Sequence, residues 1–231
     1  MSEDQLLKLM INYLQRNQAS NYHQFIIIEC GIKPAGIVGG NEVSPYSIPW
    51  QVGLVSVGGT DPWCGGTLIS PTHVLTAAHC MFGNFEVIVG EHDITDSEDG
   101  TRHTVSSAIS HPQYVEGGWT ATTDYDYAIV TLDTPVELGT RAVPACLPDP
   151  NEFGGGDLNS ATMTVSGWGH QEFGGQGPNE LHSVDVPGIS NSQCQTDYPE
   201  EQISDAMLCA GAPGGGIDAC QGDSGGKLFL K

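Results

Sequence analysis

Short apolar or alternating segments, separated by glycine, proline and asparagine, fill the chain from Trp50 onward. Side chains alternate between the two faces of a β-strand, so segments of roughly four to eight residues with this pattern predict strands. We expect strands at residues 51–57, 67–70, 74–78, 85–89 and 181–186. A stretch rich in proline and glycine at 144–156 marks the crossing between two groups of strands. The pattern predicts an all-β chain built from closed antiparallel barrels.

The composition agrees with many turns and few helices, because the 231 residues include 31 glycines and 14 prolines. This length suits one large all-β domain or two small ones. The formal net charge is −21, from 28 acidic and 7 basic residues, which argues against nucleic acid or an anionic membrane as a partner. The charge either attracts cationic peptides or serves only solubility, and the sequence leaves both interpretations open.

The segment 222–226 reads Gly-Asp-Ser-Gly-Gly and places a serine between glycines. This pattern is typical of a nucleophile on a tight turn, because glycines remove the Cβ atoms that would keep a substrate carbonyl away. The same pattern occurs in α/β-hydrolases, in which the acid and the histidine follow the serine, but only seven residues follow Ser224. The base and the acid must therefore lie upstream.

Two upstream segments supply these groups. His79 lies in Thr-Ala-Ala-His-Cys at 76–80, and Asp126 lies just before the apolar run at 128–132. The order histidine, aspartate, serine is one of the known orders of a catalytic triad. Asp124 is two residues from Asp126, so only one of them is the triad acid if the segment is extended. The choice between them follows from the family that the chain resembles, in which the triad acid stands just before such an apolar run, at the position of Asp126. Asp124 is then expected to be a solvated neighbour.

Together with Ile-Val-Gly-Gly at 37–40, these motifs make the chain from about Cys30 to its end resemble a trypsin-like serine endopeptidase of the chymotrypsin family. The resemblance implies two antiparallel six-stranded β-barrels, with the second incomplete. Because the family continues past the position of Lys231, we expect the sequence to be a fragment. The resemblance also implies hydrolysis of peptide bonds after Arg or Lys through an acyl-enzyme. Ser224 would be the nucleophile, His79 the general base and Asp126 the group that orients the His79 ring.

The resemblance assigns roles to further residues near the serine. The backbone N–H groups of Gly222 and Ser224 would stabilise the oxyanion. Asp218, six residues before Ser224, matches the carboxylate at the floor of the trypsin pocket, where it would select Arg or Lys. The alternative is that Asp218 is an ordinary turn residue after the glycines at 214–216.

We expect residues 1–36 to be a pro-segment and residues 37–231 to be the protease domain. In the family, cleavage before Ile37 would free an amino group that pairs with the acid preceding the nucleophile, here Asp223. The chain would therefore be made as a zymogen. Gly36 stands where the family usually has Arg or Lys, so the sequence does not identify the activating protease.

Seven cysteines without a Cys-x-x-Cys pair favour disulfides in an oxidising compartment over a zinc site. Spacing alone leaves their pairing open. The resemblance implies the disulfides Cys64–Cys80, Cys194–Cys209 and Cys30–Cys146, and it leaves Cys220 over. We expect a secreted, extracellular protein, although residues 1–21 lack the apolar run of a signal peptide.

The acidic loop that follows the strand at 85–89 has two interpretations. Glu91 and Glu98 match positions at which some trypsin relatives bind calcium, a cation that prefers oxygen ligands. Thr101 or Arg102 stands in the place of the last acidic ligand, so a solvated acidic loop is the alternative. No cofactor is required for the implied chemistry, and calcium would be structural.

Two functions remain open. The first is a monomeric endopeptidase. Its substrates would be proteins or peptides with Arg or Lys at the cleaved bond, and protein protease inhibitors would bind it. We expect neither nucleic acid nor a membrane as a partner. The second is a catalytically incompetent protease homologue that acts as a binding or regulatory protein. The presence of His79, Asp126 and Ser224 favours the first function, whereas Gly36 and the odd Cys220 favour the second.

Overall fold

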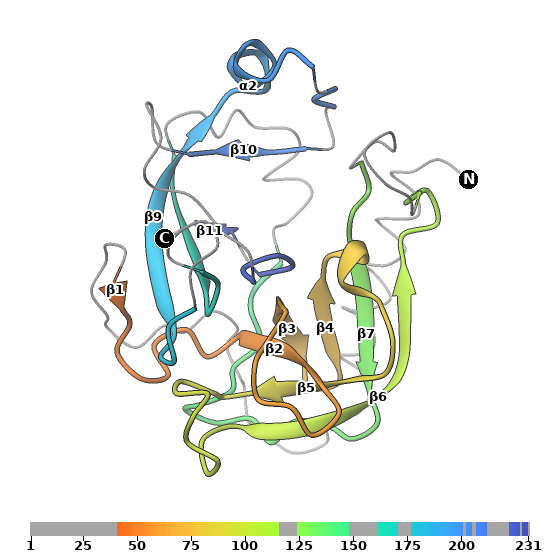
Figure 1. Ribbon diagram of the computed structural model, residues 1–231, viewed down its shortest axis with the longest axis vertical. Helices are drawn as coiled ribbons and strands as arrows, with labels where there is room; N and C mark the ends of the chain where they lie inside the picture. The colour runs from red at the N-terminus through yellow and green to blue at the C-terminus, as the bar shows by residue number, and fades with distance from the viewer. Residues whose placement is uncertain are drawn as a thin grey trace.

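The first group of strands closes into a six-stranded antiparallel barrel in the computed structural model, which describes residues 41–115, 124–147, 161–170, 177–200, 202–204, 207–211, 222–226 and 228–230 (Figure 1). Its strands are β2 (Gln51–Ser56), β3 (Cys64–Ser70), β4 (His73–Thr76), β5 (Phe85–Val89), β6 (Thr101–Ser110) and β7 (Ala128–Leu132). Hydrogen bonding runs in the order β2-β3-β4-β7-β6-β5 and returns to β2. The four strands predicted in this half correspond to β2, β3, β4 and β5, and the predicted and observed bounds differ for β2, β3 and β4.

Alternating apolar side chains fill the barrel. Val52 and Leu54 of β2, Val87 of β5 and Val130 of β7 are fully buried and belong to one core cluster. Burial of such side chains is the main favourable contribution to folding. β3 is buried along its whole length, because residues from the second half of the chain, including Ser224, pack on it.

The second group of strands forms an open sheet in the described residues, as predicted for an incomplete barrel. It consists of β1 (Asn41–Glu42), β8 (Thr162–Gly167), β9 (His182–Ile189), β10 (Cys209–Ala210) and β11 (Leu228–Leu230). The order is β1-β9-β8-β11, and β10 pairs with β9. β9 is the long strand at the left of Figure 1, with β10 crossing its upper end.

The predicted strand at 74–78 is wrong at its end. β4 ends at Thr76, and Ala78–Cys80 form a 3₁₀ turn. His79 therefore lies in a tight turn just beyond the strand. The chain turns here because Cys80 is tied to Cys64 and the His79 backbone N–H donates to Asp126, contacts that a continuing strand would not allow.

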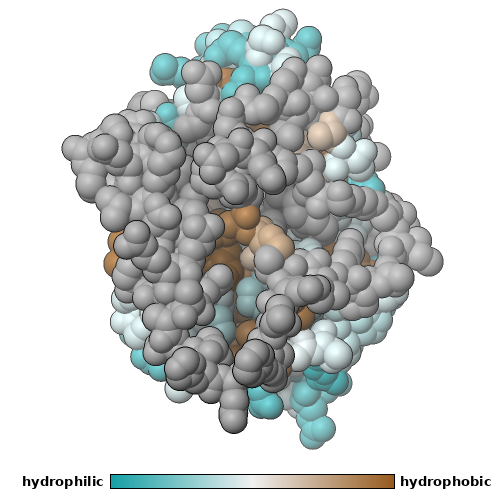
Figure 2. All heavy atoms as spheres, turned by 180° about the vertical axis from the view of Figure 1, so that it is seen from behind, coloured by the Kyte–Doolittle hydropathy of each residue, from teal (hydrophilic) through white to brown (hydrophobic). Residues whose placement is uncertain are grey.

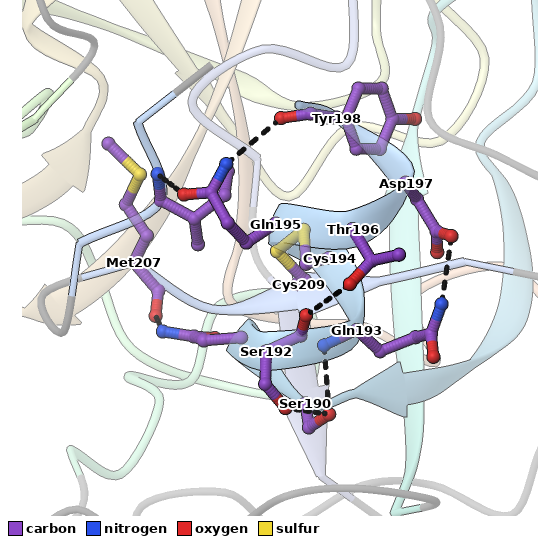
Figure 3. Close-up of a disulfide and its surroundings, with 12 residues drawn as sticks. Ser190, Ser192, Gln193, Cys194, Gln195, Thr196, Asp197, Tyr198, Met207 and Cys209 are labelled. Atoms are coloured by element: carbon purple, nitrogen blue, oxygen red, sulfur yellow. Dashed lines mark hydrogen bonds between the residues drawn. A yellow bond between two sulfur atoms is a disulfide. The ribbon is translucent and has the colours of Figure 1, made fainter. Parts of the chain in front are cut away.

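The helix α2 (Asn191–Asp197) is not predicted by the hydrophobic pattern, because its seven residues bury only Cys194. Ser190 begins the helix: its Oγ accepts a hydrogen bond from the Gln193 N–H, as an N-cap residue does. Figure 3 shows this cap and the neighbouring disulfide, which ties the helix to Cys209 on β10.

Two of the three implied disulfides are confirmed, namely Cys64–Cys80 and Cys194–Cys209. Cys146 is also disulfide-bonded. Its expected partner, Cys30, lies outside the described residues. Cys220 also lies outside them.

Figure 2 shows the opposite face of the molecule, where hydrophilic residues gather at the upper and lower ends and apolar residues are visible in a hollow near the centre. Among the described residues, no helix is long and apolar enough to cross a membrane.

A buried hydrogen bond joins the two halves of the chain. Ser166 Oγ on β8 donates to Gln51 Oε1 on β2 at 2.7 Å, and both residues are 2% exposed. Nearby, the Trp168 indole N–H donates to the His92 carbonyl oxygen at 3.1 Å. Because a buried polar group is costly when it is unpaired, these contacts restrict how the halves meet.

Gln51→Ala removes the acceptor of the Ser166 hydroxyl inside this interface. We expect the free energy of unfolding to fall by about 1–3 kcal/mol, the cost of leaving a buried donor unpaired. Urea denaturation followed by tryptophan fluorescence measures the change. Gln193→Ala, on the exposed surface of α2, is the matched control and should change stability by less than about 0.5 kcal/mol. Equal unfolding midpoints for the two variants would show that the Gln51 contact does not stabilise the interface.

Candidate active site

His79 and Asp126 are joined by two hydrogen bonds. The His79 Nδ1 lies 2.6 Å from Asp126 Oδ2, and the His79 backbone N–H donates to Asp126 Oδ1 at 2.8 Å. A carboxylate only accepts, so the Nδ1 carries the proton and the Nε2 is the basic nitrogen of the neutral ring. The His79 side chain is 45% exposed and that of Asp126 is 23% exposed. The ring is therefore accessible while its acidic partner is shielded.

The strand pairing brings these two residues together. β4 and β7 are antiparallel neighbours, and Thr76 at the end of β4 lies opposite Ala128 at the start of β7. The chain leaving β4 and the chain entering β7 therefore lie at the same edge of the barrel. His79 follows Thr76 and Asp126 precedes Ala128, so both reach the same place although they are 47 residues apart.

The pair alters the protonation of both partners. The hydrogen bond to Asp126 raises the pKa of His79 above its ordinary value; partial burial opposes this effect and the Asp126 charge adds to it. Burial alone would raise the pKa of Asp126, but hydrogen bonds from the His79 ring and from the His79 and Ala78 backbone hold that pKa below its ordinary value. Asp126 is therefore ionised at neutral pH, and His79 is a stronger base than a free imidazole.

The segment that carries Ser224 rests on β3. The Gly65 N–H donates to the Ser224 carbonyl oxygen at 2.7 Å. The same oxygen lies 3.8 Å from the Cys80 Sγ, a contact without a hydrogen bond because a disulfide sulfur carries no proton. The backbone of Ser224 thus lies beside the residue that follows His79.

Gly225, directly after the serine, has a φ of 75°, a backbone conformation that residues other than glycine rarely adopt. A Cβ atom at this position would meet the Thr76 Oγ1 and would lie 2.7 Å from the Gly65 carbonyl oxygen. Glycine is therefore required here both by the backbone conformation and by the contact with the first barrel.

Asp223, before the serine, points to the second half of the chain. Its Oδ1 accepts a hydrogen bond from the Gly169 N–H at 2.9 Å. Ile37, its expected partner after activation, and Asp218, the expected specificity residue, lie outside the described residues. Their roles stay predictions.

The prediction that Asp124 is a solvated neighbour is wrong. Asp124 is half-buried, and its Oδ1 accepts a hydrogen bond from the Ser204 Oγ at 2.9 Å. The sequence gives no signal for this contact, because Ser204 belongs to no motif and lies 80 residues away.

The two candidate calcium ligands have different surroundings. Glu91 is buried, and burial together with the negative charge of Asp99 raises its pKa to about 8. Glu98 is exposed. Asp99, which follows Glu98, already accepts hydrogen bonds from the Tyr46 hydroxyl and the Arg141 guanidinium. Calcium binding stays a prediction.

Among the described residues, three possible metal-ligating atoms lie within 4.8 Å of one another only at Cys64, His79 and Cys80. Both cysteine sulfurs there belong to the disulfide, so neither is a thiolate that a metal ion could use. This group is therefore part of the His79 site and does not form a metal centre.

A cavity of about 410 Å³ lies beside Asp126. Its lining includes Thr76, Tyr127, Cys146 and Gly225. Beside this cavity, the Asp126 carboxylate is held by its two hydrogen bonds with His79.

Comparison with known proteins gives consistent matches. The Trypsin family profile matches residues 37–231. Clotting factor G beta subunit of Tachypleus tridentatus is 37% identical over 219 residues, which cover 87% of this chain and 69% of that protein. Serine protease filzig of Drosophila melanogaster is 38% identical over 225 residues, which cover 88% of this chain but only 13% of that protein.

A solved structure agrees with these relatives. Neuropsin, a serine protease expressed in the limbic system of mouse brain, matches with a TM-score of 0.72 and 32% sequence identity, covering 84% of this chain and 82% of the neuropsin chain. The residues matched by the Trypsin family profile, 37–231, include the closed barrel, the open sheet and the segment around Ser224. The chain therefore belongs to the trypsin family of serine endopeptidases.

Proposed function

We propose that this chain cleaves peptide bonds with a triad of Ser224, His79 and Asp126. The observation that carries the proposal is the hydrogen-bonded His79–Asp126 pair at the edge of the barrel, with the Ser224 segment held beside it. Protein and peptide substrates follow from membership of the family.

In the proposed reaction, His79 Nε2 takes the proton of the Ser224 hydroxyl as the Oγ attacks the substrate carbonyl carbon. The carbon–nitrogen bond then breaks, and His79 returns the proton to the leaving amine. Water attacks the resulting ester in the same way, with His79 again as the base, and releases the acid and free Ser224. Asp126 keeps the ring oriented and stabilises the imidazolium; in proteases of this family, loss of that charge lowers turnover by about 10⁴-fold.

The oxyanion formed in each step needs hydrogen-bond donors. We assign this role to the backbone N–H groups of Gly222 and Ser224, which belong to one short segment and need no side chain. Loss of one such donor typically costs about 3 kcal/mol of transition-state stabilisation.

We also propose selection for Arg or Lys through Asp218, whose carboxylate would make a charge-assisted contact with the cationic substrate side chain. The net charge of −21 supports this proposal, since it favours the approach of cationic peptides.

The predicted disulfides that are confirmed support a secreted protein that folds in an oxidising compartment. Monomeric action and inhibition by protein protease inhibitors are part of the same proposal.

Activation is proposed to follow cleavage before Ile37. The new amino group would pair with Asp223 and so hold the Ser224 segment in its working conformation. The hydrogen bond from the Gly169 N–H to the Asp223 carboxylate supports this view, because it directs that carboxylate into the second half of the chain.

A fluorophosphonate, which reacts with activated serines, tests the catalytic proposal. For this test, the recognition sequence of a specific protease replaces residues 32–36, so that cleavage makes Ile37 the first residue. Cys30 is left in place, because its expected disulfide with Cys146 would keep the released segment attached. Mass spectrometry of the cleaved chain should find the label on Ser224. His79→Ala should slow labelling by about 10²- to 10⁴-fold, because the general base is lost. The uncleaved chain is the control for activation and should react more slowly.

No label on the folded, cleaved chain would contradict the catalytic proposal and favour the binding or regulatory homologue. A label that survives Ser224→Ala would show that another serine reacts.

Asp218→Ser tests the specificity. The preference for a peptide anilide ending in Arg over one ending in Phe, measured as the ratio of kcat/KM values, should fall by about 10- to 100-fold as the charged contact is lost. Asp133→Ser removes the same charge from an exposed position of the first barrel and should leave the ratio unchanged. An undiminished preference for Arg in Asp218→Ser would exclude Asp218 as the specificity residue.

A further inference from the structure

A hydrogen bond between the two halves of the chain lies next to the proposed triad acid. The Ser204 Oγ donates to the Asp124 Oδ1 at 2.9 Å and joins residues that are 80 positions apart. Asp124 stands two residues before Asp126, and Ser204 lies between α2 and β10. The contact therefore links the second half to the turn that presents the acid to His79.

That turn has an unfavourable backbone conformation. Tyr125 has a φ of 59°, which few residues other than glycine adopt. The Tyr127 N–H donates to the Tyr125 carbonyl oxygen at 2.7 Å, so that Asp126 is the central residue of a three-residue turn. Such a conformation persists only where the surrounding structure holds it.

The first barrel holds one side of the turn through His111. The His111 ring stacks on Tyr125, with ring centroids 4.9 Å apart and an angle of 16° between the planes. The His111 N–H donates to the Tyr127 carbonyl oxygen at 2.9 Å. Asp126 and Tyr127 of the turn also line the cavity.

Side chains of α2 hydrogen-bond to Ser204 and its neighbours. The Asn191 Nδ2 donates to the carbonyl oxygens of Ser204 and Met207, both at 2.9 Å. The Gln195 Oε1 accepts the Ile203 N–H at 3.0 Å. Figure 3 shows Met207 and Gln195 on the same side of the Cys194–Cys209 disulfide, with their hydrogen bonds as dashed lines. The segment is thus fastened to α2 at several points, and Ser204 has a fixed position from which to hold Asp124.

We propose that Ser204 and Asp124 form a positioning contact that holds the turn at 125–127, so that the Asp126 carboxylate faces the His79 ring. This inference rests on the proposed catalytic function of His79, Asp126 and Ser224. It makes Ser204 and Asp124 positioning residues that act through Asp126. They touch neither the substrate nor the reacting atoms.

Ser204→Ala tests this role in the cleaved full chain, with a fluorophosphonate as the probe. The maximal labelling rate at Ser224 should fall about tenfold, because a small misplacement of a catalytic group is costly, while the half-saturating probe concentration should not change. The acid limb of the pH–rate profile should move to lower pH, because His79 loses part of the hydrogen bond that raises its pKa. Ser204→Thr keeps the hydroxyl and should restore both values.

Two further variants separate this role from general destabilisation. Thr196→Ala removes a hydroxyl from the same disulfide-linked region without touching the turn and should label like the parent. Asp124→Ala should reproduce the effect of Ser204→Ala, and the double variant should be no slower than either, since both remove one contact.

The outcomes distinguish this inference from the catalytic proposal. If the parent chain does not label at Ser224, both fail, because there is no working Asp126 to position. If the parent labels and Ser204→Ala matches Thr196→Ala in rate and pH profile, only the positioning role is excluded. A Ser204→Ala variant that loses thermal stability but keeps its labelling rate also excludes it.

Discussion

The site depends on a backbone contact between the two halves that leaves no room for a side chain. A Cβ atom on Gly65 would lie 2.9 Å from the Gly226 Cα, a separation that real Cβ atoms essentially never show. Across this contact the Gly65 N–H holds the Ser224 carbonyl oxygen. Any larger residue at Gly65 would push the serine segment off β3 and away from His79. A Cβ atom on Gly226 would instead lie 2.7 Å from the Asp223 carbonyl oxygen within that segment. The first barrel thus positions both the base and the segment that bears the serine.

Local hydrogen bonding dominates the electrostatics of the site, despite the large net negative charge. Exposed acids more than about 8 Å from His79 are largely screened at physiological salt. Asp126 lies 2.6 Å from the ring and is partly shielded from water, so it has the larger effect on the His79 pKa. The position of this one carboxylate matters more for the base than the remaining acidic residues. For this reason the contacts that hold the turn around Asp126 bear on the chemistry.

The sequence predicted β2, β3, β4 and β5 of the first barrel, because a short apolar or alternating run is a local property of the chain. The strand β6 escaped prediction, because most of its residues are exposed and form no apolar run. The motifs around His79 and Ser224 likewise occupy consecutive residues. The helix α2 escaped prediction because it buries a single side chain. The Ser204–Asp124 bond escaped prediction because it depends on how the halves pack, which no spacing along the chain encodes.

The most direct test of this account is an NMR titration of the His79 imidazole in isotopically labelled protein, assigned with His79→Gln. His79 is expected to titrate above the ordinary histidine range, whereas His73 and His103, whose pKa values are lowered by burial, are expected to titrate below it. Asp126→Asn should bring the pKa of His79 to its ordinary value or lower, since burial then acts without the charged partner. A His79 that titrates in the ordinary range and does not respond to Asp126→Asn would contradict the account.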